Sequence, residues 1–120
     1  MDMEDKMVHS TIRLLIAAKK RNEVLGILSS VAERCRIEPG CISCHVYQDT
    51  EEERVVMLEE IWRSEKDLKR HLRSEEYLKV LLSVEMALKP PEIRFNTISH
   101  STGFETIEKA RNFIPGEGRR

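Results

Sequence analysis

A strand followed directly by a capped helix is the feature that most constrains this chain. Residues 55–62, VVMLEEIW, form an apolar run of strand length that is rich in branched side chains and has polar segments on both sides. Ser64 is followed three residues later by Asp67. A hydroxyl and an acid at that spacing can satisfy the unpaired amides of a first helical turn. The sequence therefore predicts a strand ending at Trp62 and a helix beginning at Ser64.

That helix has one apolar face that includes a histidine. Its members recur at spacings of three and four residues: Leu68, His71, Leu72, Leu78, Leu81 and Leu82. Ser74 marks a restart of the helix within this stretch. In the preceding strand, alternation places Glu60 and Trp62 on the same face. A helix returning across that face would bring His71, Glu60 and Trp62 around one small space.

The remaining elements complete a β-α-β-β-α-β order. Alternation predicts a strand over 7–17, helical periodicity predicts a helix over 19–37 that Pro39-Gly40 ends, and further strands follow over 41–48 and 93–100. The polar link 49–54 has a length suited to a hairpin. This order is the ferredoxin-like α+β arrangement, with an antiparallel sheet and both helices on one of its faces.

Length and charge limit the organisation and the partners of the chain. With 120 residues it fits one domain, which we place at 8–100, between a flexible N-terminus at 1–7 and a short helix and tail at 101–120. Twenty basic side chains are balanced by twenty-one acidic ones. Nucleic-acid binding is not expected, because it needs a basic face. The acidic start and the lack of a long apolar segment predict a cytoplasmic protein without a membrane span.

Three cysteines fit reduced thiols better than a disulfide framework. Cys41 and Cys44 are three residues apart in a predicted strand, so alternation sends them to opposite faces. At that spacing they would not share a metal ion, and no second pair completes a zinc site. We expect structural cysteines and no metal site.

The sheet face away from the helices predicts a partner. It carries apolar residues that would form a large exposed patch on a monomer: Leu15, Val55, Met57, Ile61 and Ile98. A homodimer with the two sheets packed face to face would cover them.

Four short motifs carry a resemblance to a known family. They are Pro39-Gly40-Cys41, the strand end Val46-Tyr47, Glu60-x-Trp62, and His71 nine residues later. Over roughly residues 8–100 the chain resembles the antibiotic biosynthesis monooxygenase family of dimeric α+β barrels. Relatives with this pattern include oxygenases of quinols and aromatic polyketides that use no cofactor, heme-degrading enzymes, and an isomerase of a phosphorylated signal molecule. Fold alone does not choose among these activities.

The resemblance implies an oxygenase site between helices and sheet that takes a small aromatic phenol or quinol and needs no cofactor. His71 would move the substrate's proton, because the ordinary imidazole pKa of about 6.5 lies near working pH. Glu60, the second catalytic residue, would orient His71 or hold a substrate hydroxyl. The expected substrate-binding residues are Trp62, Tyr77, Ser10 and Ile12.

Other interpretations stay open at this point. Trp62 can be core filling, and Glu60 and His71 can be a structural pair. The chain can then be a dimeric module that binds a small apolar ligand without catalysis. A third class is an isomerase or lyase that uses His71 and Glu60 on a small polar metabolite. Heme degradation is less expected, because relatives with that activity use an asparagine on the first strand, where this chain has Ser10 and Ile12.

Overall fold

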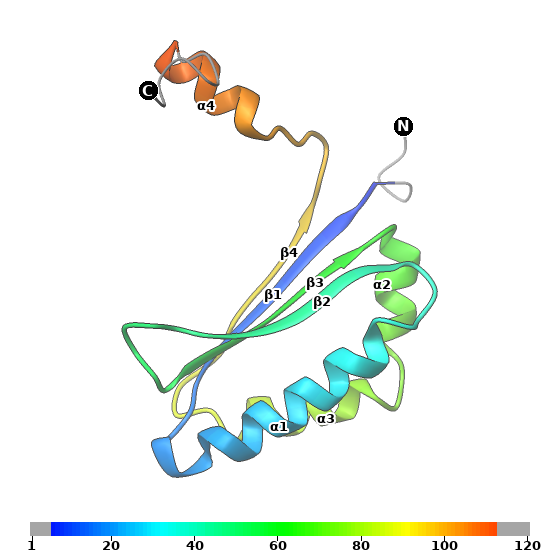
Figure 1. The fold of residues 1–120 in the computed structure, drawn as a ribbon. Coiled ribbons are helices and arrows are strands. Elements are labelled where there is room, and N and C mark those ends of the chain that lie inside the picture. Colours follow the sequence, from blue (N-terminus) through cyan, green and yellow to red (C-terminus); the bar gives the residue numbers. More distant parts are fainter. Residues whose placement is uncertain (1–5, 113–120) are drawn as a thin grey trace.

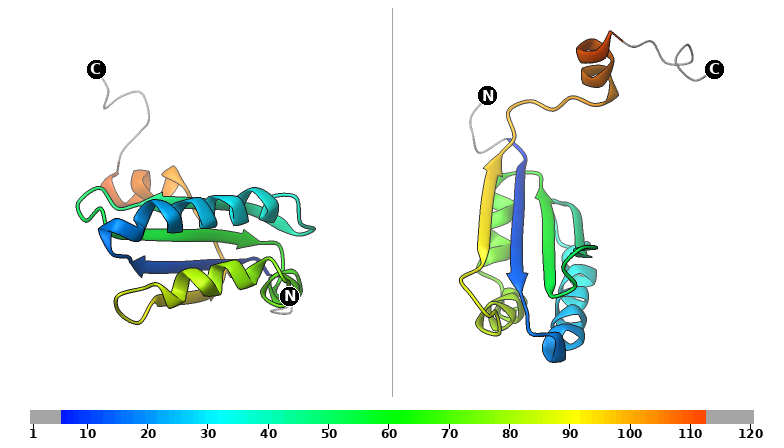
Figure 2. Two further views of the ribbon diagram at one scale, coloured as in Figure 1. Left: turned by 90° about the horizontal axis from the view of Figure 1, so that it is seen from below. Right: turned by 90° about the vertical axis from the view of Figure 1, so that its left-hand side faces the viewer.

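The computed structural model describes residues 6–112 as one sheet covered by helices (Figure 1). The elements, in chain order, are β1 (Val8–Leu15), α1 (Ala18–Cys35), β2 (Cys41–Gln48), β3 (Val55–Trp62), α2 (Glu65–Leu72), α3 (Tyr77–Glu85), β4 (Glu92–Thr97) and α4 (Phe104–Arg111). The strands form one antiparallel sheet in the order β2-β3-β1-β4. Figure 2 shows α1 and α3 running side by side over one face of the sheet. The predicted α+β, ferredoxin-like fold is confirmed.

The predicted second helix is two helices, and both starts involve a serine. The Ser64 side chain accepts a hydrogen bond from the Asp67 amide at 3.2 Å, which caps α2 as predicted. At the break, the Ser74 hydroxyl donates to the carbonyl of His71 at 2.7 Å. Oγ of Ser74 also accepts a hydrogen bond from the Tyr77 amide at 3.3 Å, at the residue where α3 begins. Ser74 thus ends one helix and starts the next, and His71 and Tyr77 both face inward. The prediction that Leu78, Leu81 and Leu82 share this inward face was wrong, because the break at Ser74 changes the phase of the helix: all three are exposed, and the buried residues of α3 are Tyr77, Val80 and Ser83.

The turn between α1 and β2 packs against the start of α2. Gly40 adopts a left-handed backbone with φ of 83°, which residues with a side chain rarely adopt. A Cβ at this position would lie 2.2 Å from Cγ of Asp67. The carbonyl of Gly40 also accepts a hydrogen bond from the Arg63 amide at 2.8 Å. The absence of a side chain at Gly40 is what lets the turn lie so close to α2.

The start of β2 corrects the expectation about the cysteines. Cys41 is opposite Trp62 and Cys44 is opposite Glu60, and both of those residues face the helices. Regular alternation cannot give this result. A bulge between Cys41 and Ser43 shifts the register by one residue. The prediction that Cys41 and Cys44 point to opposite faces was therefore wrong.

Side chains on the helix-covered face form rows across the strands. One row, in sheet order, consists of Cys44, Glu60, Ser10 and Phe95. Ile12 lies in the neighbouring row, opposite Leu58 and Ile93. Most of this face is core, but β4 at the sheet edge is exposed along its whole length. Phe95, for example, is 45% exposed, so the helices leave the β4 edge of this face open.

The opposite sheet face is less exposed than predicted. Val55 is buried, and Leu15, Met57 and Ile61 are half-buried in a single chain. Part of the reason is that Leu15 and Val55 are directly paired across β1 and β3. Ile98 is half-buried too, so the predicted large exposed patch was wrong for Val55 and the other four residues are only partly exposed.

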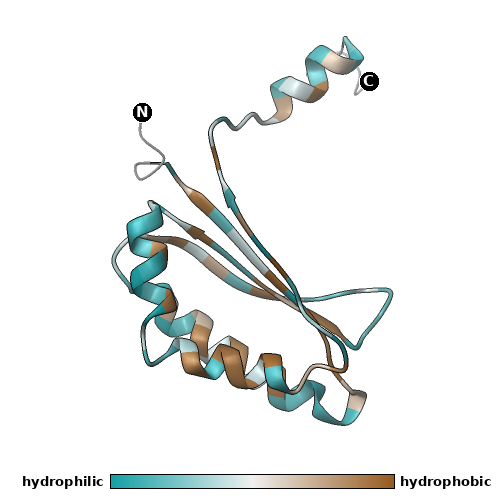
Figure 3. Ribbon diagram, turned by 180° about the vertical axis from the view of Figure 1, so that it is seen from behind, coloured by the Kyte–Doolittle hydropathy of each residue, from teal (hydrophilic) through white to brown (hydrophobic). Residues whose placement is uncertain are grey.

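The elements at the ends differ in how much the structure shows. The predicted C-terminal helix is present as α4, which has no buried residue and stands apart from the sheet in Figure 1 and in the right-hand view of Figure 2. The flexible start predicted at 1–7 and the tail at 101–120 lie partly outside the described residues. The ribbon coloured by residue hydropathy in Figure 3 shows that most residues of α2 are hydrophilic and that many residues of α3 are hydrophobic. Among residues 6–112, no helix has the length and apolar character needed to cross a membrane.

Candidate functional site

Three of the residues predicted from the sequence meet in a buried polar network. The Trp62 indole Nε1 donates to Glu60 Oε1 at 2.8 Å. The other carboxylate oxygen, Glu60 Oε2, lies 3.3 Å from His71 Nε2. Trp62 and His71 are fully buried and Glu60 is 1% exposed. The expected meeting of His71, Glu60 and Trp62 is present, with the Glu60 carboxylate in polar contact with a nitrogen of each ring.

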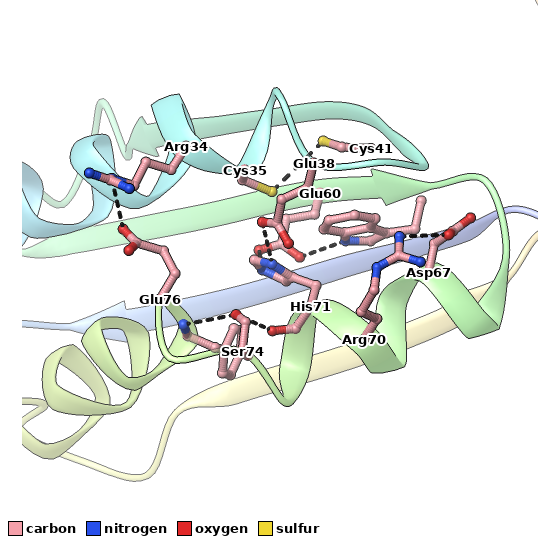
Figure 4. A network of polar contacts seen from close by, with 12 residues as sticks. Arg34, Cys35, Glu38, Cys41, Glu60, Asp67, Arg70, His71, Ser74 and Glu76 are labelled. Atoms are coloured by element: carbon pink, nitrogen blue, oxygen red, sulfur yellow. Dashed lines mark hydrogen bonds and ion pairs between the residues drawn. The ribbon is translucent and has the colours of Figure 1, made fainter.

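Glu38 is a fourth member that the sequence did not reveal. Its Oε2 lies 2.8 Å from Nδ1 of His71, so both imidazole nitrogens face carboxylates (Figure 4). Glu38 lies in the turn after α1, and 33 residues separate it from His71. No periodicity marks it, and its only sequence signal is its place beside Pro39-Gly40, whose turn directs it toward α2.

The electrostatics of the network favour a charged imidazole. Burial alone lowers the pKa of His71, but the hydrogen bond and charge of Glu60, together with Glu38, outweigh it, so the pKa of His71 is raised. A protonated ring can donate from both nitrogens, whereas a neutral ring would leave one lone pair facing a carboxylate. The two carboxylates and the direction of the His71 pKa shift both favour the protonated form of the ring.

Aromatic rings enclose the imidazole. Its centroid lies 4.6 Å from that of Trp62, with the planes tilted by 32°. Tyr77 approaches edge-on at 5.2 Å, with an angle of 83°. Burial and the charge of Glu60 raise the pKa of Tyr77, so its phenol stays protonated. Tyr77 therefore contacts the network, and it faces inward because the helix restarts after Ser74.

The two substrate-binding residues predicted on β1, Ser10 and Ile12, have different surroundings. Ser10 is 2% exposed and lies in the row between Glu60 and Phe95. Ile12 is also 2% exposed, but its cross-strand neighbours Leu58 and Ile93 are apolar. Ser10 adjoins the polar network, whereas Ile12 belongs to the hydrophobic core.

Two clefts lie near the network, and of its members only Glu38 lines one of them. The first, of about 300 Å³, lies between α2 and the β1–β4 edge and is lined by Val8, Glu65, Leu68, Lys69, Leu72, Phe95 and Thr97. The second, of about 350 Å³, is lined by Arg34, Ile37, Glu38, Pro39, Ser74 and Glu76. The first is mainly apolar and borders the row that contains Ser10. The second contains Glu38, whose side chain is 23% exposed and links the network to solvent.

Cys35 lies where two groups of potential metal ligands meet. Its sulfur is grouped with Glu38 and His71 in one set and with Cys44 and Glu60 in the other, and within each set the ligand atoms are within 4.8 Å of one another. Cys41 Sγ, which belongs to neither set, lies 3.7 Å from Cys35 Sγ.

The architecture is that of a ferredoxin-like α+β domain with a buried histidine–carboxylate network between sheet and helices. Residues 7–81 match the family described as antibiotic biosynthesis monooxygenase, which is more than half of the chain. The chain belongs to that family. Its resemblance to the family, stated above from the motifs, is thereby confirmed.

Two curated relatives are similar but uncharacterised proteins. One, from Synechocystis, is 30% identical over 83 residues, which are 68% of this chain. The chain spans only about half of that relative's length, 56%. The other, from Bacillus subtilis, is 33% identical over 79 residues, covering 62% of this chain and 75% of the relative.

Solved structures share the fold. A conserved protein of Methanosarcina mazei has a TM-score of 0.72 and 25% identity, over 79% of this chain and 95% of that one. A protein of Mycobacterium tuberculosis has a TM-score of 0.73 at 21% identity, and the match covers 81% of this chain and 99% of that one. A protein from Nitrosomonas europaea that is assigned to the same family has a TM-score of 0.72 at 17% identity, and the match covers 86% of this chain and 100% of that one. At the identities of the last two, the likeness shows the fold alone.

Proposed function

We propose that this protein is a monooxygenase that oxidises a small aromatic phenol or quinol with O₂ and without a cofactor. The observation that carries the proposal is the sheet row in which Ser10 lies between Phe95, at the apolar cleft, and Glu60, in the histidine network. A cleft of about 300 Å³ is at the lower end of the volumes that hold small ligands. Membership of the monooxygenase family supports the same class of reaction.

The proposed reaction begins with loss of a proton from the substrate. The resulting anion is electron-rich enough to pass one electron to O₂, and the two radicals then combine at carbon. For a substrate with a reactive CH₂ beside a phenol, one oxygen atom becomes the new carbonyl. The other oxygen atom leaves as water with the two hydrogens of that carbon, so R₂CH₂ and O₂ give R₂C=O and H₂O. The protein has only to bind the ring, accept the proton and return it.

The proposed proton route uses residues on both sides of Glu60. Ser10 would pass the proton from the cleft to the Glu60 carboxylate, while the imidazolium of His71 stabilises the charges beside it. The proton would go on from Glu60 through the two ring nitrogens of His71 to Glu38, which reaches the second cleft and would exchange it with water. Trp62 fixes Glu60 through its indole N–H. In this proposal Trp62 supports the carboxylate rather than forming a wall for the substrate.

Oxygen uptake with a panel of quinols and anthrone-like phenols tests the function. We expect uptake above the uncatalysed rate in the wild type and its collapse in His71→Ala. Leu72→Trp should also abolish it, because a larger side chain would fill the apolar cleft. His45→Gln is the matched control, since His45 is exposed on the other sheet face. Uptake that survives both His71→Ala and Leu72→Trp would overturn the proposal.

The full burial of His71 favours a second function, a dimeric module that binds a small apolar ligand without catalysis. In that case Leu72→Trp would abolish binding of an apolar fluorescent probe in the cleft. The wild type would show no uptake with any substrate of the panel. Probe binding without oxygen uptake would select this function over the oxygenase.

We also propose that the chain forms a homodimer through the sheet face away from the helices. Met57 and Ile61 are half-buried there and apolar, and a second copy would cover them. Met57→Lys should convert a dimer to a monomer in sedimentation experiments. Ile37→Lys, at a position 86% exposed in the turn after α1, should leave the dimer intact. A wild-type monomer at micromolar concentration would contradict this proposal.

A further inference from the structure

Helix α4 buries none of its residues against the part of the chain that the structure describes. Every residue of Phe104–Arg111 is exposed except Glu108, which is half-buried, and Ile107 is 49% exposed. Isolated helices shorter than about 12–15 residues are marginal in water, because few internal hydrogen bonds offset the cost of starting them. A helix of eight residues therefore needs an apolar surface beyond its own domain to be stable.

The position of α4 indicates where that surface lies. Figure 1 shows α4 on the side of the sheet opposite to α1, α2 and α3, and the reversed view in Figure 3 agrees. This is the side of the apolar sheet face that carries Met57 and Ile61. Half-buried Ile98 belongs to the same face by alternation, and its amide donates to the carbonyl of Met7 at 2.8 Å. The apolar face thus continues directly into the segment that leads to α4.

That segment is long enough to reach past a second copy packed on this face. Residues 99–103 are exposed and have no helical or strand structure. Five extended residues span at most about 17 Å, whereas two stacked sheets lie about 10 Å apart. In a dimer with the two sheets face to face, the segment would carry α4 beyond the plane of the partner's sheet. The helix would then lie against the side of the second copy.

We propose that α4 is an arm that packs its apolar side on a second copy of this chain, so that two copies exchange their C-terminal helices. The inference rests on the homodimer proposed above and is independent of the oxygenase reaction. Ile107 lies on the same side of α4 as Phe104, three residues earlier, whereas Lys109 is on the opposite side. In a two-fold dimer the contact occurs twice, since each copy contributes one arm and receives one.

Hydrogen exchange of the α4 amides in the full chain tests the arm. We expect exchange at least about tenfold slower in the wild-type dimer than in the Met57→Lys monomer, where the helix loses its partner. Ile37→Lys, which should leave the dimer intact, should keep the protection. Equal exchange of α4 in the dimer and in the monomer would overturn the proposal. A wild-type monomer would overturn the homodimer and the arm together, but would leave the oxygenase proposal standing.

Two glutamine substitutions in α4 test which side of the helix makes the contact. Ile107→Gln should raise the dissociation constant of the dimer at least about tenfold, because an apolar side chain is lost from both copies of the contact. Lys109→Gln introduces the same residue on the opposite side and should leave the dissociation constant unchanged. Sedimentation over a range of concentrations measures both. An unchanged constant in Ile107→Gln, or equal weakening in the two variants, would overturn the proposal.

Discussion

Glu38 and His71 are in direct contact, with 2.8 Å between Oε2 and Nδ1, although one lies in a turn after α1 and the other in α2. Together with Glu60 on the other ring nitrogen, this contact surrounds the imidazole with two carboxylates. The contact joins two segments whose sequences show no relation to each other. It also makes the charge of His71 depend on a residue that solvent can reach.

Replacing Glu38 by Gln should lower the pKa of His71. The amide keeps the size of the side chain and can still bond Nδ1, but it removes one of the two negative charges that raise this pKa. A titration of the imidazole signals by NMR measures the change. Glu33→Gln, an exposed position on α1, is the control and should have no effect. A His71 pKa that is the same in wild type and Glu38→Gln would refute the role assigned to Glu38.

The stability of the protein should fall as the pH rises above about 6.5. The pKa of His71 in the folded protein is raised above its ordinary value, so the folded state holds this proton more tightly than the unfolded state. The stabilisation is complete below about 6.5 and is lost as the pH rises through the folded pKa. Urea midpoints of wild type and Glu38→Gln should therefore differ most near pH 6 and converge as the pH rises toward 8.5.

The useful range for that measurement ends near the ordinary thiol pKa of about 8.5. Burial raises the pKa of Cys41, and Cys44 together with burial raises that of Cys35, so both thiols add their own loss of stability at higher pH. If the urea midpoints of wild type and Glu38→Gln differ by the same amount throughout pH 6 to 8.5, then Glu38 stabilises the fold independently of the charge on His71.

Losing the indole N–H of Trp62 should destabilise the fold even if the ring is kept. Trp62→Phe leaves Glu60 Oε1 buried without its donor at 2.8 Å, and an unsatisfied buried acceptor costs roughly 1–3 kcal/mol. Urea unfolding followed by circular dichroism measures this, since Trp62 is the sole tryptophan. Tyr47→Phe removes an exposed bond to Glu59 of 3.4 Å and should cost less than about 0.5 kcal/mol. Equal losses would contradict the importance of the buried bond.

Local patterns account for the parts of the fold that the sequence predicted. Periodicity located the strands and helices, and the hydroxyls of Ser64 and Ser74 indicated where helices start. Alternation in β3 placed Glu60 and Trp62 on one face, and helical spacing turned His71 toward them. These inferences depend only on residues close in sequence, which is why they could be made.

The features that were missed depend on contacts between distant segments. Glu38 is part of the network because a turn folds against α2, and Cys41 faces inward because of a bulge that alternation cannot reveal. The apolar cleft forms where α2 leaves Phe95 at the sheet edge uncovered, which depends on how the helix packs. Each needs three-dimensional information that single-segment patterns lack.

Two glycines should respond in opposite ways to the same substitution. Gly40→Ala places a Cβ in a left-handed backbone and 2.2 Å from Asp67 Cγ, so the turn or the start of α2 must shift, at a cost of at least about 1 kcal/mol. Gly26→Ala, within α1 and with no atom within 4 Å of the new methyl group, should stabilise the helix by roughly 0.5–1 kcal/mol. Urea unfolding of both variants measures the two changes in the free energy of unfolding, which should have opposite signs.

The Gly40 variant also tests whether this turn positions the network. Because Glu38 lies two residues before Gly40, a displaced turn should lengthen its contact with His71 and lower the His71 pKa. Gly26→Ala, which changes α1 without touching the turn, should leave that pKa unchanged. If Gly40→Ala loses stability but keeps the His71 titration of the wild type, then Glu38 is held by α1 itself and the close approach of the turn to Asp67 serves packing alone.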